Sequence, residues 1–183
     1  MTPTATSLRT VLNLGCGNTP LPEVRFPPTE WREIRVDASP SVDVDVVADI
    51  TALPFGDESA DGVCCLACLE HVPEGLVGAV LKEIHRVLRP GGELLLAVPD
   101  LRAIAQAIVD GQLVDVVEHA PSGPIRPLDM LYGHAGYATL DPLMSHRTGF
   151  TAETLANWLR TVGFEGEMGH AGRWLLCVDV RKT

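Results

Sequence analysis

The chain has 183 residues, the size of a single domain, and its formal net charge is -10. Hydrophobic residues make up 46% and charged residues 21%, and no apolar stretch reaches the roughly 20 residues that cross a bilayer. The acidic balance and the scattered arginines disfavour nucleic-acid and anionic-membrane partners.

The cellular setting follows from the N-terminus and the cysteines. The segment "MTPTATSLRT" has no basic start followed by an apolar core, so we expect no signal peptide. The five cysteines are an odd number and stand mostly in apolar runs, which is typical of reduced, buried thiols. These features predict a cytoplasmic protein.

Strand and helix patterns alternate along the chain. Strands are expected at residues 10–14, 33–37, 44–48, 62–67, 92–98, 164–168 and 173–180. Helices are expected at 74–88, at 100–110 with Asp100 as N-cap, and at 151–162 with Thr151 as N-cap. At residues 89–92, "RPGG" should end the first helix and turn the chain. The alternation predicts an α/β domain with a largely parallel sheet.

Two connections depart from a regular pattern. The segment from 17 to 33 contains four prolines, so a long first crossover helix is not expected. Residues 111–149 carry no clear periodicity and hold four further prolines. A loop that long in a compact domain is usually functional, so we expect a lid or a substrate wall there.

The stretch "VLNLGCGNTP", residues 11–20, joins an apolar strand to Gly15-Cys16-Gly17. Two glycines one residue apart mark a turn where the backbone approaches something closely. Ligands of open α/β sheets bind outside the carboxyl ends of the strands. A tight turn without a ligand is the alternative.

Two further acids stand at expected strand ends. Asp37 follows Gly17 by 20 residues and suits the diol of a ribose. Asp49 suits an adenine amino group, while Ile50 beside it would pack on the ring. The alternative for Asp49 is a cap on the turn before Pro54.

A nicotinamide dinucleotide fits this pattern poorly. Its pyrophosphate needs a third glycine and a helix N-terminus, whereas Asn18 and Thr19 follow the glycine pair here. A nucleoside cofactor without phosphates, such as S-adenosylmethionine, needs neither.

Taken with this pattern, the sequence resembles the class I S-adenosylmethionine-dependent methyltransferases, in particular the small bacterial type 11 group. The matching stretches, in chain order, are "VLNLGCGN", "IRVDAS", "VVADITALPFGDESADGV", "CLEHVP", "EIHRVLRPGGELLLAVPDL" and "HRTGFTAETLANWLRTVGFE". The resemblance implies a single methyltransferase domain over residues 1–183. It also implies a three-layer Rossmann-like fold, whose mostly parallel seven-stranded sheet has an antiparallel last strand.

The resemblance also implies roles for individual residues in binding S-adenosyl-L-methionine. The implied cofactor site comprises Asn13, Gly15, Cys16, Gly17, Asp37, Ala38, Asp49, Ile50, Leu66, Ala67 and His71. Within it, the glycine loop, Leu66 and Ala67 approach the methionine moiety. Asn13 stands where the family commonly has an acid.

The implied reaction is methyl transfer to a small-molecule acceptor by in-line displacement at the sulfonium methyl carbon. The leaving thioether is neutral and needs no acid, so proximity and orientation supply much of the rate. A base helps only an acceptor that must lose a proton, and His146, His134 and Tyr132 in the 111–149 segment are the candidates.

Other functions remain open at this point. Asn13, and the missing N-terminal helix that often covers the cofactor in the family, favour a regulatory or scaffold protein that binds S-adenosylmethionine without transferring its methyl group. The missing cover also leaves a homodimer open. A nicotinamide-dependent oxidoreductase and a nucleic-acid amino-methyltransferase rank lower, since "ACLEH" replaces the proline-rich motif of the latter.

A metal ion is not expected. Cys65-x-x-Cys68 with His71 suggests zinc, but a structural zinc site needs four ligands and the sequence has no second pair. Glu70 and His71 could equally solvate the start of the helix at residue 74.

Overall fold

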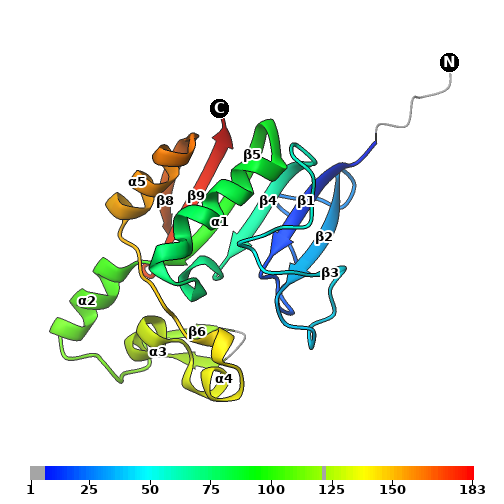
Figure 1. The fold of residues 1–183 in the computed structure, drawn as a ribbon. Coiled ribbons are helices and arrows are strands. Elements are labelled where there is room, and N and C mark those ends of the chain that lie inside the picture. The colour runs from blue at the N-terminus through cyan, green and yellow to red at the C-terminus, as the bar shows by residue number, and fades with distance from the viewer. Residues whose placement is uncertain (1–6, 121–122) are drawn as a thin grey trace.

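The computed structural model describes residues 7–120 and 123–183, and within these residues seven strands form one sheet in the order β3-β2-β1-β4-β5-β9-β8 (Figure 1). The strands are β1 (Arg9–Leu14), β2 (Trp31–Asp37), β3 (Val46–Val47), β4 (Ala60–Leu66), β5 (Leu88–Pro99), β8 (Phe164–Ala171) and β9 (Leu175–Lys182). The first five run parallel, and β9 is antiparallel to both β5 and β8. This arrangement confirms the expected fold.

The three expected helices are present, as α1 (Glu74–Val87), α2 (Leu101–Val109) and α5 (Ala152–Val162). The Asp100 side chain caps α2 by accepting a hydrogen bond from a backbone amide of its first turn. The Thr151 side chain caps α5 in the same way. Among the described helices, none combines the length and apolar character needed to cross a membrane.

The two faces of the sheet are covered differently. On one face, α1 and α5 pack side by side (Figure 1) over core residues that include Leu12, Leu14, Val63 and Cys65. On the other face, the chain between β1 and β2 packs Leu21 and Phe26 against the sheet beside Trp31. That connection has no helix among its described residues, which confirms what its prolines predicted.

The start of β5 differs from the expectation. We predicted a turn at "RPGG" and a strand from residue 92, but α1 ends at Val87 and β5 begins directly at Leu88. Leu88 pairs with Ala60, and the register then shifts before Gly62 pairs with Glu93. This irregularity accommodates the proline and glycines within the strand, with Gly91 at φ +74°.

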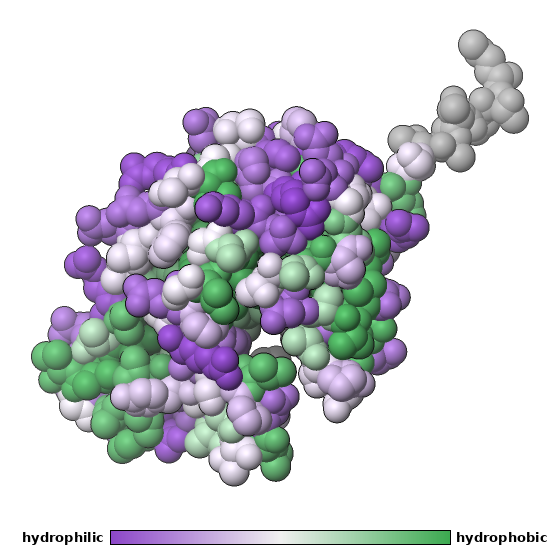
Figure 2. All heavy atoms as spheres, in the orientation of Figure 1, coloured by the Kyte–Doolittle hydropathy of each residue, from purple (hydrophilic) through white to green (hydrophobic). Residues whose placement is uncertain are grey.

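The segment 111–149, called the insert below, contains short elements that its sequence did not reveal. They are β6 (Glu118–Ala120), β7 (Gly123–Ile125), α3 (Pro127–Tyr132), α4 (Ala135–Leu140) and a 3-10 turn, Pro142–Met144. Each is too short for a periodic pattern. Residues 121–122 of the insert lie outside the described residues. The insert lies beyond the carboxyl ends of β4 and β5 (Figure 1), and Figure 2 shows the surface notched beside it.

An arginine anchors the connection between β3 and β4, which carries Asp49 and Ile50. The Arg86 guanidinium on α1 donates to the carboxylates of Glu83 and Asp57, each at 2.8 Å. It also donates to the carbonyls of Phe55, at 2.8 Å, and Leu53, at 3.2 Å. These hydrogen bonds raise the pKa of Arg86 and lower that of Glu83.

We predict that Arg86→Lys lowers the free energy of unfolding by about 1–3 kcal/mol, because a single ammonium cannot serve acceptors spread around a planar guanidinium. Urea denaturation measures the change. Arg32→Lys, at an exposed position of β2, is the matched control and should change stability by less than about 0.5 kcal/mol. Equal stability of the two variants would contradict the anchoring role.

Candidate active site

The glycine loop leaves β1 with two residues in the left-handed region, Gly15 at φ +60° and Gly17 at φ +48°. A Cβ atom on Gly15 would lie 2.2 Å from the Sγ atom of Cys68. The loop after β1 therefore packs against the loop after β4 so closely that only glycine fits at position 15. At Gly17 a Cβ atom would meet no described atom within 4 Å.

Asp37, at the end of β2, ties the glycine loop in place. Its Oδ2 atom accepts a hydrogen bond from the Gly17 amide at 2.9 Å, and its Oδ1 atom accepts one from the Ser39 amide at 2.9 Å. A carboxylate has about four acceptor positions, so two remain for a ligand. The structure thus brings together the loop and the acid that the sequence analysis placed at one rim, and Ala38 is exposed beside them.

The Asn13 side chain on β1 forms a hydrogen bond to the neighbouring strand β2. It is buried, and its amide donates to the Glu33 carboxylate on β2 at 2.7 Å. Arg35, two residues further along β2, donates to the Gly17 carbonyl at 2.6 Å. Glu33 therefore places a carboxylate directly against the Asn13 side chain.

Asp49 and Ile50 follow β3. The Oδ1 atom of Asp49 accepts hydrogen bonds from the Thr51 amide at 2.8 Å and the Thr51 hydroxyl at 2.7 Å. Asp49 thus caps a turn, as the alternative interpretation held. It is exposed, and Ile50 is buried in the core beside it.

The chain leaves β4 through a strained residue. Ala67 has φ +49°, in a region that costs a residue with a Cβ atom about 1–2 kcal/mol. Its amide donates to the Ala97 carbonyl on β5 at 2.9 Å, which holds this conformation. The strain lies at the expected methionine end, beside half-buried Leu66, and strained backbone concentrates at functional sites.

Glu70 lies in the 3-10 turn Leu69–His71 that follows, and it does not solvate the start of α1. Its exposed fraction is 2%, which contradicts that alternative. Its carbonyl accepts hydrogen bonds from the amides of Arg147, at 2.8 Å, and Thr148, at 3.2 Å, so the end of the insert covers it. Burial raises the pKa of the Glu70 carboxyl to about 8.

His71 and His146 pack against each other beside this carboxyl group, with ring centroids 4.8 Å apart in an edge-to-face arrangement. The Nδ1 atom of His71 lies 3.2 Å from the Ser145 carbonyl, and that of His146 lies 2.8 Å from the Met130 carbonyl. Burial lowers the pKa of both imidazoles, and His71 helps to lower that of His146 to about 4. Both rings are therefore neutral near pH 7.

The three candidate bases occupy different places. His146 reaches the Glu70 and His71 side chains. Tyr132 is exposed and lines the mouth of a pocket. His134 packs on Tyr137, with ring centroids 5.0 Å apart, and does not line that pocket.

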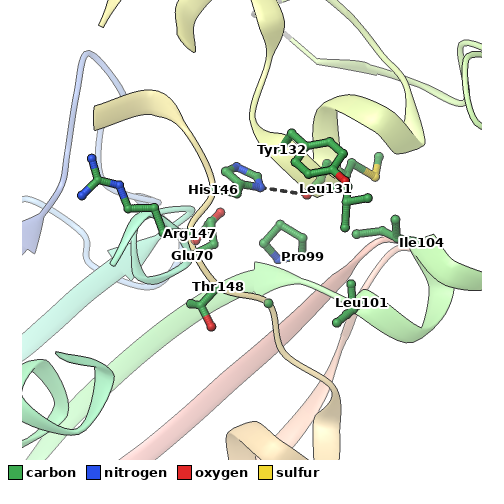
Figure 3. Close-up of a pocket in the computed structure, with 11 residues that line it drawn as sticks. Glu70, Pro99, Leu101, Ile104, Leu131, Tyr132, His146, Arg147 and Thr148 are labelled. Atoms are coloured by element: carbon green, nitrogen blue, oxygen red, sulfur yellow. Dashed lines mark hydrogen bonds between the residues drawn. The ribbon is translucent and has the colours of Figure 1, made fainter. Parts of the chain in front are cut away.

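This pocket has a volume of about 190 Å³ and lies between β5, α2 and the insert (Figure 3). Its wall is mostly apolar, and Glu70 and His146 contribute polar groups to it. The apolar lining comes from Pro99, Leu101, Ile104, Met130 and Leu131. The sequence analysis named Glu70 but missed its burial, because the residues that cover it follow more than 70 positions later.

Comparisons with known proteins bear on this arrangement. Residues 12–96 match the family model Methyltransf_11, described as a methyltransferase domain. Methyltransferase GfsG of Streptomyces halstedii is 36% identical over 77 residues, which are 42% of this chain. The match spans only 24% of that protein's length.

Solved structures share the fold across nearly the whole chain. A SAM dependent methyltransferase from Archaeoglobus fulgidus aligns with 96% of this chain and 87% of its own, with a TM-score of 0.65 and 15% identity. The 1,6-didemethyltoxoflavin-N1-methyltransferase of Burkholderia thailandensis aligns with 96% of this chain and 72% of its own, with a TM-score of 0.61 and 21% identity. That protein was solved with 1,6-didemethyltoxoflavin and S-adenosylhomocysteine bound.

Proposed function

We propose that this chain, which carries a class I S-adenosylmethionine-dependent methyltransferase domain, transfers a methyl group from S-adenosylmethionine to a small-molecule acceptor. The family match and the sheet order support the class of reaction. The observation that carries the acceptor class is the mostly apolar pocket between β5, α2 and the insert, whose volume of about 190 Å³ suits a small molecule.

The cofactor would lie along the carboxyl ends of β1, β2, β3 and β4. Asp37 has acceptor positions left for the ribose diol, and Gly17 is held beside it. The Oδ1 atom of Asp49 is engaged by Thr51, so its Oδ2 atom would accept from the adenine amino group. Gly15, Cys16, Leu66 and Ala67 would border the methionine moiety.

The acceptor would lie in the pocket on the other side of the turn that carries Glu70. This turn connects the two sites, because Cys68 packs against Gly15 while Glu70 lines the pocket. The reaction needs the acceptor atom aligned behind the methyl carbon, and the apolar wall would supply that orientation. A buried imidazole with a pKa near 4 is a weak base at neutral pH, so orientation carries more of the rate than proton removal by His146.

We predict that S-adenosylhomocysteine raises the melting temperature of the protein by about 5–11 °C at 100 times its dissociation constant. Such an excess adds about 2.7 kcal/mol, and a chain of this size gains about 2–4 °C per kcal/mol. NAD is the control and should give no shift. The absence of a shift with S-adenosylhomocysteine would contradict cofactor binding.

Methyl transfer is then tested by mass spectrometry with S-adenosylmethionine and a panel of small hydroxyl, amine and thiol compounds. A methylated product supports the enzyme. Cofactor binding without product from any compound of a broad panel would favour the alternative, a binding or scaffold protein.

A further inference from the structure

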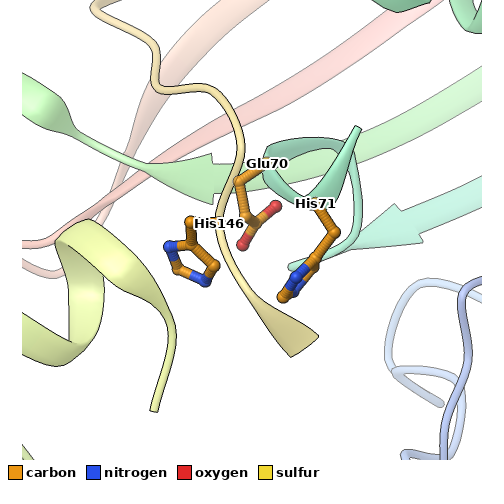
Figure 4. A group of neighbouring side chains, drawn as sticks. All are labelled: Glu70, His71 and His146. Carbon is orange, nitrogen blue, oxygen red and sulfur yellow. The ribbon is translucent and has the colours of Figure 1, made fainter. Parts of the chain in front are cut away.

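Three potential metal ligands from two distant parts of the chain meet beside the pocket. Glu70 and His71 come from the turn after β4, and His146 comes from the end of the insert. One ligand atom from each lies within 4.8 Å of the others, and Figure 4 shows the Glu70 carboxylate beside the two rings.

The backbone sets both imidazoles in the form that binds metals. A carbonyl oxygen only accepts hydrogen bonds, so the Ser145 and Met130 carbonyls require the hydrogen on Nδ1 of His71 and His146. The lone pair then lies on Nε2 of each ring. A backbone carbonyl that holds the other ring nitrogen is the usual support of a metal-binding histidine.

Glu70 provides a second and independent observation. Its side chain is buried, and its Oε2 atom has no hydrogen-bond partner anywhere in residues 7–120 and 123–183. A buried polar atom without a partner costs stability, and buried carboxylates normally pair with a cation or bind a metal. A cation held between the two histidines would satisfy this atom.

We propose that Glu70, His71 and His146 bind a divalent transition-metal ion of the Zn²⁺ type. Two imidazole nitrogens and one carboxylate oxygen suit such an ion better than Mg²⁺ or Ca²⁺, which prefer oxygen ligands. Three protein ligands also leave a coordination position open, as in catalytic zinc sites. Ligands about 2.1 Å from zinc lie about 3.4 Å apart in a tetrahedron, so binding draws the insert toward the turn after β4.

This site differs from the cysteine-based zinc site that the sequence suggests. Cys65 faces the helix-covered core and Cys68 packs against Gly15, so neither thiol belongs to the three-ligand group. His146 lies 75 residues after His71 in the chain, and only the folded insert brings the two together.

The ion's role in catalysis rests on the proposed function, whereas its binding does not. Glu70 and His146 also line the pocket, so a hydroxyl acceptor there could take the open coordination position. Coordination lowers the pKa of the hydroxyl, which releases its proton to solvent. The oxygen then bonds to the methyl carbon as the carbon–sulfur bond breaks, and S-adenosylhomocysteine leaves as a neutral thioether.

Titration calorimetry with Zn²⁺ on the metal-free full chain tests the site. We expect one bound equivalent, and an affinity at least about 100-fold weaker in Glu70→Gln and in His146→Phe, the latter keeping a ring against His71. The controls are His119→Phe and Glu153→Gln, both at exposed positions, and these should bind as the wild type does. Circular dichroism checks that each variant folds. If His146→Phe does not fold, the Zn²⁺ affinity of Glu70→Gln alone decides whether the site exists.

The absorption spectrum of Co²⁺ bound in place of Zn²⁺ distinguishes nitrogen and oxygen ligands from a thiolate ligand. The proposed site gives visible d–d bands without the near-ultraviolet charge-transfer band of a thiolate ligand. Equal Zn²⁺ affinity in wild type and Glu70→Gln, or a thiolate band, would overturn the proposal. If the melting temperature rises with S-adenosylhomocysteine but no Zn²⁺ binds, the metal site fails and the proposed cofactor site stands.

Discussion

Replacing Asp37 with alanine is expected to weaken S-adenosylhomocysteine binding by at least about 100-fold. The carboxylate would accept two hydrogen bonds from the ribose diol, and a hydrogen bond to a charged group contributes about 1.5–3 kcal/mol. The same carboxylate holds the Gly17 amide at 2.9 Å and the Ser39 amide at 2.9 Å. The substitution therefore removes both the ligand contacts and the anchor of the loop that borders them.

Calorimetric titration with S-adenosylhomocysteine measures this loss. Asp43→Ala makes the same change of charge at an exposed position between β2 and β3, and it should leave the affinity within about threefold. Asp37→Asn keeps the shape but loses the charge and one acceptor, so its affinity should fall between those of the wild type and Asp37→Ala. If Asp37→Ala binds as tightly as Asp43→Ala does, Asp37 does not hold the ribose.

The features that sequence analysis predicted well are local. The N-caps Asp100 and Thr151 act on amides within three residues of themselves, and the three helices follow apolar periodicity within a few turns. The contact between Gly17 and Asp37 is not local, because the two residues lie 20 positions apart in the chain. It was predictable because parallel strands bring their carboxyl ends to one edge of a sheet.

The features that sequence analysis missed depend on which segments meet. The sequence left a solvated helix start open for Glu70 and His71, because nothing near them in the chain shows that residues 145–148 cover them. The pairing of Asn13 with Glu33 was also hidden. It depends on the register of β1 against β2, in which Asn13 lies opposite Arg35 and Val11 opposite Glu33.

Gly15→Ala is expected to lower the free energy of unfolding by about 3 kcal/mol, which corresponds to a melting temperature about 6–12 °C lower. Two costs add up. The φ of +60° strains any residue with a Cβ atom by about 1–2 kcal/mol. The new Cβ atom would also lie 2.2 Å from Cys68 Sγ and 2.7 Å from Cys68 Cβ, so the two loops must separate.

Gly17→Ala separates these two costs, because Gly17 has a similar φ of +48° but its Cβ atom would meet no described atom within 4 Å. Thermal and urea denaturation should therefore show only the backbone cost of about 1–2 kcal/mol for Gly17→Ala. In a Cys68→Ala background the sulfur is gone, and Gly15→Ala should cost less by about 0.5–3 kcal/mol, the range of coupling between contacting residues. Equal destabilisation by the two glycine substitutions, with no relief from Cys68→Ala, would mean that the loops after β1 and β4 are not in tight contact. Such a result would also weaken the link between cofactor site and pocket, because Cys68 is the residue through which the glycine loop meets the turn that carries Glu70.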